Sequence, residues 1–320
     1  MSDPKEPEIL APRPLGRTDL LAPALCLGTS GLGSIPRIYG YEVDNEQALR
    51  TLRAVFAGPI QFIDTGNSYG GGESERRIGT VLREIGGVPP GFLLSTKVDP
   101  DASGDFSGRR VYESVEESCA RLGMDFLPLV YLHDPERIEF DYAIGPDGPV
   151  AALLAMREQG RIGYLGVAGG PVEMLRRYVQ LGHFDAVITH NRYTLLDRSA
   201  EPLLRDCATA GVAALNAAPF GGGILVKGPD AAPRYAYRSA GDLIRERVQA
   251  MERVCSRAGV PLAAAALQFS LREPRISSTI VGLTRPERIA QVLELARTPV
   301  PEAVWTELEA CTPSPQNWLG

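Results

Sequence analysis

The stretch FLLSTKVDPDASGDFSGRRVYESVEESCARLGMDFLPLVYLH, residues 92–133, contains the pattern that decides the fold. Its two ends, residues 92–98 and 127–133, are short, largely apolar runs rich in strand-forming residues, and residues 109–122 between them have the apolar spacing of a helix face. The two runs do not alternate between apolar and polar residues, which is typical of parallel strands covered on both faces. The stretch therefore predicts a strand–helix–strand unit of a parallel sheet.

The same alternation recurs along the whole chain. The predicted strands are Ala24–Gly28, Gln61–Asp64, Phe92–Val98, Leu127–His133, Tyr164–Ala168, Ala186–Thr189, Val212–Asn216 and Ser278–Gly282. The predicted helices are Asp44–Ala57, Glu73–Ile85, Arg109–Leu122, Val150–Gln159, Val172–Leu181, Ser199–Ala210, Asp242–Ala258 and Pro286–Leu295. Eight such units predict a single (β/α)₈ barrel with its active site at the carboxyl ends of the strands. The competing doubly wound sheet would have GxGxxG after its first strand, and GTSGLG (28–33) does not fit that pattern.

The expected organisation is an N-terminal arm over residues 1–13, a barrel over 14–311 and a C-terminal tail over 312–320. Two connections are long, Asp134–Pro149 after the fourth strand and Pro219–Gly241 after the seventh. Both follow strands at the end of the barrel where active sites form, so we expect them to shape a ligand pocket.

Composition excludes several classes of function. The 320 residues are 44% hydrophobic and 22% charged, which is ordinary for a folded protein. The formal charge of −6 gives no reason to expect nucleic acid as a partner. No apolar run approaches the roughly 20 residues of a membrane-spanning helix, and the opening MSDPKEPE is not a signal peptide. A cytoplasmic protein with no membrane partner is expected.

The cysteines and histidines argue against a metal centre. The five cysteines are far apart and form no CxxC pair, so we expect reduced and mostly buried thiols. Only three histidines are present, which disfavours a multi-histidine metal site. No metal is therefore expected.

Polar residues at the ends of three consecutive predicted strands are the candidates for catalysis. Asp64, Lys97 and His133 occupy these positions, and Tyr69 follows the first of them in a turn. Neighbouring strands are about 4.8 Å apart, so the side chains can converge at the mouth of a barrel. Taken singly, each residue could be a turn, cap or packing residue. A lysine inside an apolar strand nevertheless needs a partner for its charge, and Asp64 can supply it.

The segments that carry these residues resemble the aldo-keto reductase family. FIDTGNSYGGGESERRIG (62–79), STKV (95–98) and YLHD (131–134) occur in the family's order, as do PLGRTDL (14–20) and IVGLTRPERIAQVL (280–293). The resemblance runs from about residue 13 to residue 311. It implies the barrel, a nicotinamide cofactor and a small-molecule substrate.

The resemblance also implies a catalytic tetrad of Asp64, Tyr69, Lys97 and His133. Tyr69 would be the general acid for reduction and the general base for oxidation. A tyrosine pKa near ~10 suits neutral pH poorly, so we expect the Lys97 ammonium to lower it. Asp64 would hold Lys97, and His133 would orient the substrate oxygen.

Cofactor contacts are expected after the seventh and eighth strands. The loop with Pro219, Phe220, Gly221 and Gly223 would bring backbone amides to a diphosphate. The resemblance places the adenosine end near Gly282, Arg288 and Gln291, with Arg288 near a helix start. Gly282-Leu283 replaces the Lys-Ser of many NADP-dependent members, which favours NAD slightly over NADP.

Four positions at the nicotinamide end depart from the family pattern. Ala168-Gly169 replaces a Ser-Asn pair, His190 replaces a glutamine, and Ala217 replaces a stacking aromatic. We therefore expect His190 or Asn191 to help hold the nicotinamide carboxamide.

The segments HNRYTLLDR (190–198) and NAAPFGGGIL (216–225) resemble one branch of the family. Members of that branch oxidise sugars such as L-fucose, L-galactose and other D-threo-aldoses, or oxidise pyridoxal. The leading hypothesis is an aldose 1-dehydrogenase that converts a hemiacetal to a lactone, and the alternative is a pyridoxal 4-dehydrogenase. A general aldehyde reductase, a nicotinamide-binding regulatory subunit and a hydrolase remain open.

Four aromatic residues could stack on the substrate ring: Tyr39, Tyr41, Phe140 and Trp318. The chain is expected to be a monomer or a weak homo-oligomer.

Overall fold

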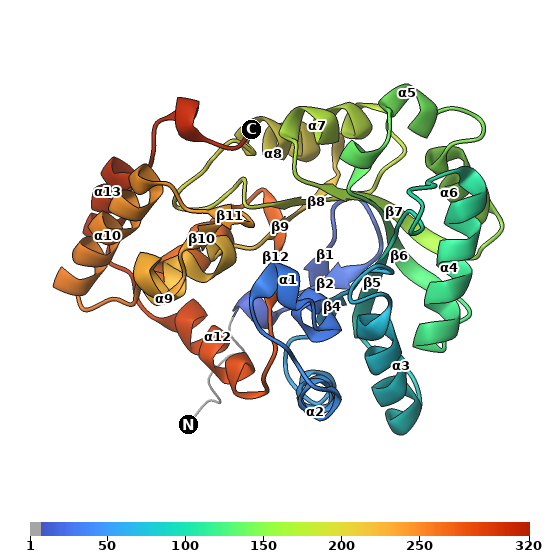
Figure 1. The fold of residues 1–320 in the computed structure, drawn as a ribbon, viewed down its shortest axis with the longest axis horizontal. Coiled ribbons are helices and arrows are strands. Elements are labelled where there is room, and N and C mark those ends of the chain that lie inside the picture. Colours follow the sequence, from blue (N-terminus) through green and yellow to red (C-terminus); the bar gives the residue numbers. More distant parts are fainter. Residues whose placement is uncertain (1–7) are drawn as a thin grey trace.

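The computed structural model describes residues 8–320, and its centre is a closed barrel of eight parallel strands (Figure 1). Their order around the barrel is β12-β3-β4-β5-β6-β7-β8-β9. The strands are β3 (Leu25–Gly28), β4 (Phe62–Asp64), β5 (Leu93–Val98), β6 (Leu127–His133), β7 (Ile162–Gly169), β8 (Ala186–His190), β9 (Ala213–Ala217) and β12 (Ile276–Gly282). Each overlaps one of the eight predicted strands, and the predicted (β/α)₈ barrel is confirmed.

Helices cover the outside of the barrel. Those against the strands are α2 (Asn45–Phe56), α3 (Glu73–Ile85), α4 (Gly108–Leu122), α6 (Pro149–Glu158), α7 (Val172–Gln180), α8 (Glu201–Ala210), α11 (Leu262–Leu271) and α12 (Glu287–Arg297). Their ends follow from local chemistry. Asp44 caps α2 by accepting the Gln47 amide at 2.8 Å, and Ser107 caps α4 by accepting the Arg110 amide at 3.3 Å.

The layer over β9 and β12 differs from the prediction. The predicted helix 242–258 exists as α10 (Asp242–Arg257), but it packs in an outer layer with α9 (Ile224–Ala231) and α13 (Glu302–Cys311), at the left of Figure 1. The helix that contacts β12 is α11. Its sequence, LAAAALQFSL, is apolar on all sides because it is buried between the barrel and the outer helices, so it has no amphipathic pattern to recognise.

A short hairpin lies at the amino-terminal end of the barrel. Its strands are β1 (Arg13–Pro14) and β2 (Leu21–Ala22), and Leu15 between them is 1% exposed within the barrel's interior cluster. The predicted arm begins outside the described residues, since residues 1–7 are not covered. The division into arm, barrel and tail stays a prediction.

The connections at the carboxyl ends of the strands carry short elements of their own. They are η2 (Ser30–Gly33) and α1 (Pro36–Tyr39) after β3, η3 (Pro135–Arg137) and α5 (Phe140–Ala143) after β6, and η4 (Gly221–Gly223), β10 (Arg234–Tyr235) and β11 (Arg238–Ser239) after β9. Arg234 Nη1 donates to the Ile38 carbonyl at 3.2 Å, which joins the β10–β11 hairpin to α1. The connection after β3 and the connection after β9 are therefore in contact with each other.

Four of the five cysteines are buried, Cys311 is half-buried, and all five are free thiols. Over residues 8–320, no single helix has both the length and the apolar character to cross a membrane; the bent pair α10–α11 passes on length and composition only.

Candidate active site

The four predicted catalytic residues meet at the carboxyl ends of β4, β5 and β6. Lys97 Nζ lies 2.5 Å from Asp64 Oδ2 and also donates to the Thr65 carbonyl. Asp64 Oδ1 accepts the Ser95 hydroxyl at 2.9 Å. Lys97 is 2% exposed and Asp64 3%, so the ion pair is buried, and its partners satisfy the lysine charge as expected.

Tyr69 and His133 lie over this ion pair. Lys97 Nζ is 4.7 Å from the centre of the Tyr69 ring, and the His133 ring meets the Tyr69 ring edge-on with centres 5.6 Å apart. Gly70, which follows Tyr69, has a φ of +64°, and a Cβ there would collide with the Gly33 carbonyl. The glycine therefore lets the turn that carries Tyr69 pack directly against η2.

The pKa of Tyr69 departs from the sequence expectation. Burial raises the pKa of Tyr69 well above its ordinary value, and the Asp64 carboxylate raises it further. We expected Lys97 to lower this pKa. The ammonium is instead paired with Asp64, so little net positive charge reaches the phenol, and Tyr69 is a protonated phenol in this structure.

The sequence analysis missed Asp99, which follows the end of β5. Its Oδ1 lies 2.7 Å from His133 Nδ1, its Oδ2 accepts the Ser68 amide at 3.0 Å, and it is 1% exposed. One signal was available. Lys97 and Asp99 are two residues apart, and side chains at this spacing point to the same side of a strand.

The pKa values of Asp99 and His133 shift in a coupled way. Burial lowers the pKa of His133, but the charge and hydrogen bond of Asp99 overcome this effect and hold the pKa above its ordinary value. Burial likewise raises the pKa of Asp99, but the charge and hydrogen bond of His133 bring it below its usual range. Both shifts favour the state in which an imidazolium lies beside a carboxylate.

Asn191 and His190 lie at the end of β8, where the nicotinamide carboxamide was expected. Asn191 Nδ2 is 3.2 Å from His190 Nδ1, and Asn191 has a φ of +60°. Asn191 Oδ1 is buried and has no hydrogen-bond partner among residues 8–320. Burial and the charge of Arg192 lower the pKa of His190 to about 4, so its ring is neutral. An unpartnered amide oxygen beside a neutral imidazole fits the NH₂ group of a carboxamide.

The substitution at position 169 has a steric reason. A Cβ on Gly169 would lie 2.9 Å from Glu136 Oε2 and 3.0 Å from Pro135, in the turn after β6. A side chain at this position would therefore require the end of the Glu136 side chain to move and would press on the Pro135 ring. Ala168 pairs with His133, and Ala217 pairs with His190, so small residues flank both histidines.

The predicted diphosphate and adenosine positions lie on neighbouring strands. Pro219, Phe220, Gly221 and Gly223 follow β9, Gly282 ends β12, and β9 pairs with β12. Successive φ values of +58°, +77° and +101° at residues 221–223 require glycine. On the outer side of α12, Arg288 Nη1 donates to Gln291 Oε1 at 2.9 Å in an exposed hydrogen bond.

The four predicted substrate aromatics have different surroundings. Tyr39 Oη lies 2.6 Å from Ser30 Oγ, and the Tyr39 ring stacks on Tyr41 with centres 5.8 Å apart. Phe140 packs instead between α5 and α7, 4.9 Å from the Tyr178 ring and 3.6 Å from the Arg177 guanidinium. The Trp318 indole donates to the Pro313 carbonyl within the tail at 2.9 Å. Phe140 and Trp318 thus both have partners within the chain, and their role toward a substrate stays a prediction.

Tyr237 is an aromatic residue near the site that the sequence analysis did not single out. It forms the tip of the β10–β11 hairpin together with Ala236, and both have positive φ values, +67° and +48°. The Tyr237 ring meets the His190 ring with centres 5.8 Å apart. The length of the connection after β9 predicted a loop here, but not which residue would reach the strand ends.

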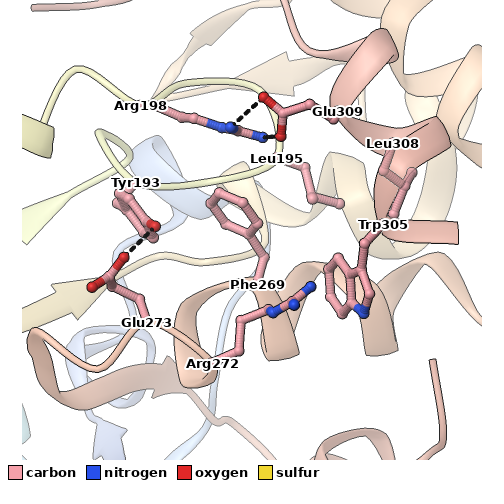
Figure 2. A pocket seen from close by; sticks show the side chains of 9 residues that line it. All are labelled: Tyr193, Leu195, Arg198, Phe269, Arg272, Glu273, Trp305, Leu308 and Glu309. Carbon is pink, nitrogen blue, oxygen red and sulfur yellow. Dashed lines mark hydrogen bonds and ion pairs between the residues drawn. The ribbon is translucent and has the colours of Figure 1, made fainter. Parts of the chain in front are cut away.

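A cavity of about 240 Å³ lies elsewhere, between α11, α13 and the segment after β8 (Figure 2). Two of its carboxylates have partners: Glu309 accepts a hydrogen bond from Arg198 at 2.6 Å, and Glu273 accepts one from the Tyr193 hydroxyl at 2.9 Å. The Arg272 guanidinium lies 4.4 Å from the Trp305 ring centre. None of the described residues that line it belongs to the predicted site.

Comparison with known proteins places the chain in one enzyme family. The model of the Aldo/keto reductase family matches residues 24–313. The chain is 31% identical to a D-threo-aldose 1-dehydrogenase from a Pseudomonas species, over 90% of this chain and 94% of that protein. It is 30% identical to the pyridoxal 4-dehydrogenase of Microbacterium luteolum, over 93% of this chain and 96% of that protein.

The fold has a counterpart among solved structures. The holo form of an aldo-keto reductase from Bacillus halodurans superposes with a TM-score of 0.75 at 20% identity, covering 94% of this chain and 96% of that one. At this identity the likeness concerns the fold alone.

Proposed function

Because the chain belongs to the aldo/keto reductase family, we propose that it is an aldose 1-dehydrogenase acting on D-threo-aldoses such as L-fucose. The observation that carries the redox chemistry is the buried Lys97–Asp64 pair beneath Tyr69, with His133 at its edge. The sugar substrate is supported by the 31% identity to the Pseudomonas aldose dehydrogenase over nearly the full length of both chains.

We propose that the cofactor is a nicotinamide dinucleotide, with NAD favoured. A nicotinamide ring bound at this site would supply the hydride acceptor for the substrate carbon. Asn191 Oδ1 and the neutral His190 would hold the carboxamide, the glycine turn at 221–223 the diphosphate, and Gly282, Arg288 and Gln291 the adenosine end. The absence of a lysine at Gly282-Leu283 favours NAD, because a cation there would suit the 2′-phosphate of NADP.

The proposed reaction converts a cyclic hemiacetal to a lactone. Tyr69 first gives its own phenol proton to solvent. The C1–H bond then breaks with its electron pair leaving as hydride, the C1–OH proton passes to the Tyr69 phenolate oxygen, and C1 becomes a carbonyl. Asp64 holds Lys97, whose ammonium lies 4.7 Å from the Tyr69 ring centre and would offset part of the cost that burial and the Asp64 charge impose on the phenolate. His133 donates a hydrogen bond to the same substrate oxygen.

Pyridoxal oxidation is the second candidate, favoured by the 30% identity to the Microbacterium enzyme. Pyridoxal also forms a cyclic hemiacetal, so the same four residues would serve it. Residues in the connections at the carboxyl end of the barrel would discriminate between the sugar ring and the pyridoxal ring. We propose that Tyr39, Tyr41 and Tyr237 are among them.

Initial rates of reduced-nicotinamide formation test the proposal. We expect a sugar-dependent rate with L-fucose and NAD that exceeds the rate with NADP, with L-galactose and pyridoxal measured in parallel. The Tyr69→Phe variant should lose about 10²-fold or more in turnover, because the phenol is the proton-transfer group, and should still bind the cofactor. A rate with pyridoxal alone would select the second candidate, and retention of most activity by Tyr69→Phe would contradict the mechanism.

A further inference from the structure

The Asp99 carboxylate joins two parts of the candidate site. Its Oδ1 contacts His133 Nδ1 at 2.7 Å, and its Oδ2 accepts the amide of Ser68, which precedes Tyr69, at 3.0 Å. One buried side chain therefore contacts both the histidine ring and the turn that carries the tyrosine.

We propose that Asp99 is a positioning residue for the redox reaction, holding His133 as an imidazolium whose Nε2–H faces the substrate oxygen while fixing the turn before Tyr69. This inference rests on the proposed function, because it gives a role in that reaction to His133.

The geometry fixes which ring nitrogen is available. A carboxylate can only accept hydrogen bonds, so His133 Nδ1 must donate to Asp99. Nε2 is then the remaining nitrogen, and it carries the second proton of the imidazolium. A charged donor makes a stronger hydrogen bond to a developing alkoxide than a neutral ring does. Asp99 thus favours the form of His133 that best stabilises the oxygen as its proton leaves for Tyr69.

The backbone of Asp99 is itself held in place by α4. The Asp99 amide donates to Ser114 Oγ at 3.3 Å, and Arg110 Nε donates to the Asp99 carbonyl at 3.2 Å. Glu117 holds the Arg110 guanidinium at 2.7 Å. The carboxylate therefore extends from a rigid support, which is what a group that orients another side chain requires.

Other charged groups also face His133. Asp134 Oδ1 lies 3.6 Å from His133 Nε2, but Asp134 is held by Arg137 at 2.7 Å. The titratable groups around the ring are Asp99, Asp134, Glu136, Lys97, Tyr69 and His190. Asp99 is the one bonded directly to the ring at Nδ1, and its charge and hydrogen bond are the largest influences that raise the His133 pKa.

Proton NMR titration of the imidazole signals tests the proposal without any turnover. The His133 signal is assigned by its loss in the His133→Gln variant. We expect wild-type His133 to titrate above 6.5, and Asp99→Asn to move its pKa below 6.5, because burial and the Lys97 charge are then opposed only by the weaker effect of Asp134. Asp101→Asn is the matched control. Asp101 is in the same connection, but it bonds only to the nearby residues Ser103 and Asp105, so its loss should leave the His133 pKa unchanged.

Steady-state kinetics gives a second readout. Asp99→Asn should lower kcat by about tenfold or more, a part of the roughly 10²–10⁴-fold that positioned proton-transfer groups supply. Because the protonated ring is the active form, the alkaline limb of the pH–kcat profile should move to lower pH as the NMR pKa falls. Cofactor affinity should not change. A wild-type His133 that is neutral at pH 6.5, or an Asp99→Asn variant with unchanged His133 pKa, would overturn the proposal. An inactive wild-type protein with the expected NMR shifts would instead count against the proposed substrate.

Discussion

Lys97 shows how strongly a single residue depends on its partner in this site. Its ammonium is buried against Asp64, and Asp64 in turn is only 3% exposed. Replacing Lys97 by Met should cost about 3–5 kcal/mol of unfolding free energy, because it leaves the Asp64 charge buried without a counter-charge. Urea denaturation measures this loss.

A double variant separates the charge from the packing. Asp64→Asn with Lys97→Met removes both charges, so we expect it to be more stable than Lys97→Met alone, although both variants should be inactive. If the two substitutions instead added their losses, the buried pair would not be the source of the cost.

The same residues show what the sequence could predict about the site. A lysine inside an apolar strand needs a carboxylate partner, and the parallel pairing of β4 with β5 places Asp64 beside Lys97. The direction of the Tyr69 pKa could not be predicted, because it depends on how fully Asp64 offsets the ammonium. Asp99 was missed because its role depends on the position of a histidine on the neighbouring strand, 34 residues away.

At the scale of elements, the turn between β4 and α3 provides the next prediction. Gly70 and Gly71 have nearly equal φ values, +64° and +63°, but a Cβ would collide with the Gly33 carbonyl only at Gly70. Gly71→Ala should cost about 1–2 kcal/mol, the price of left-handed backbone. Gly70→Ala should cost more and lower kcat, because the turn must move and takes Tyr69 with it. Equal losses of stability and activity in the two variants would show that the contact with η2 does not position the tyrosine.

The strands were easier to predict than the helices over β9 and β12. Strand positions followed from short apolar runs, which remain recognisable because both faces of a barrel strand are buried. The amphipathic pattern of 242–258 predicts a barrel helix, yet the structure gives that place to α11, whose alanine-rich sequence lies between the barrel and the outer helices. A helix under a second layer loses the periodicity that identifies a surface helix.

At the scale of the whole molecule, the two histidines at the barrel mouth respond to pH in opposite ways. The pKa of His190 is lowered to about 4 by burial and the Arg192 charge, whereas the pKa of His133 is held above its ordinary value by Asp99. The contribution of His133 to the free energy of unfolding is complete below pH ~6.5 and is lost as the pH rises through its folded pKa. Asp99, with its lowered pKa, loses its contribution only as the pH falls below about 4. Between pH 6.5 and 5, His190 therefore changes the stability whereas His133 and Asp99 do not, and the comparison of a His190 variant with the wild type isolates its effect from that of other groups.

Within that window we expect His190 to destabilise the protein as the pH falls. The unfolded chain binds a proton at His190 near pH 6.5, and the folded protein does so only near pH 4, so acid favours unfolding. Integrated from pH 7 to pH 5, this difference costs about 2 kcal/mol. Urea denaturation at both pH values should show a smaller loss for His190→Gln, while the exposed His183→Gln variant should lose as much as the wild type. An equal loss in His190→Gln would mean that the mouth of the barrel admits a charged ring at position 190, and the neutral imidazole proposed to hold the carboxamide would then have to be abandoned.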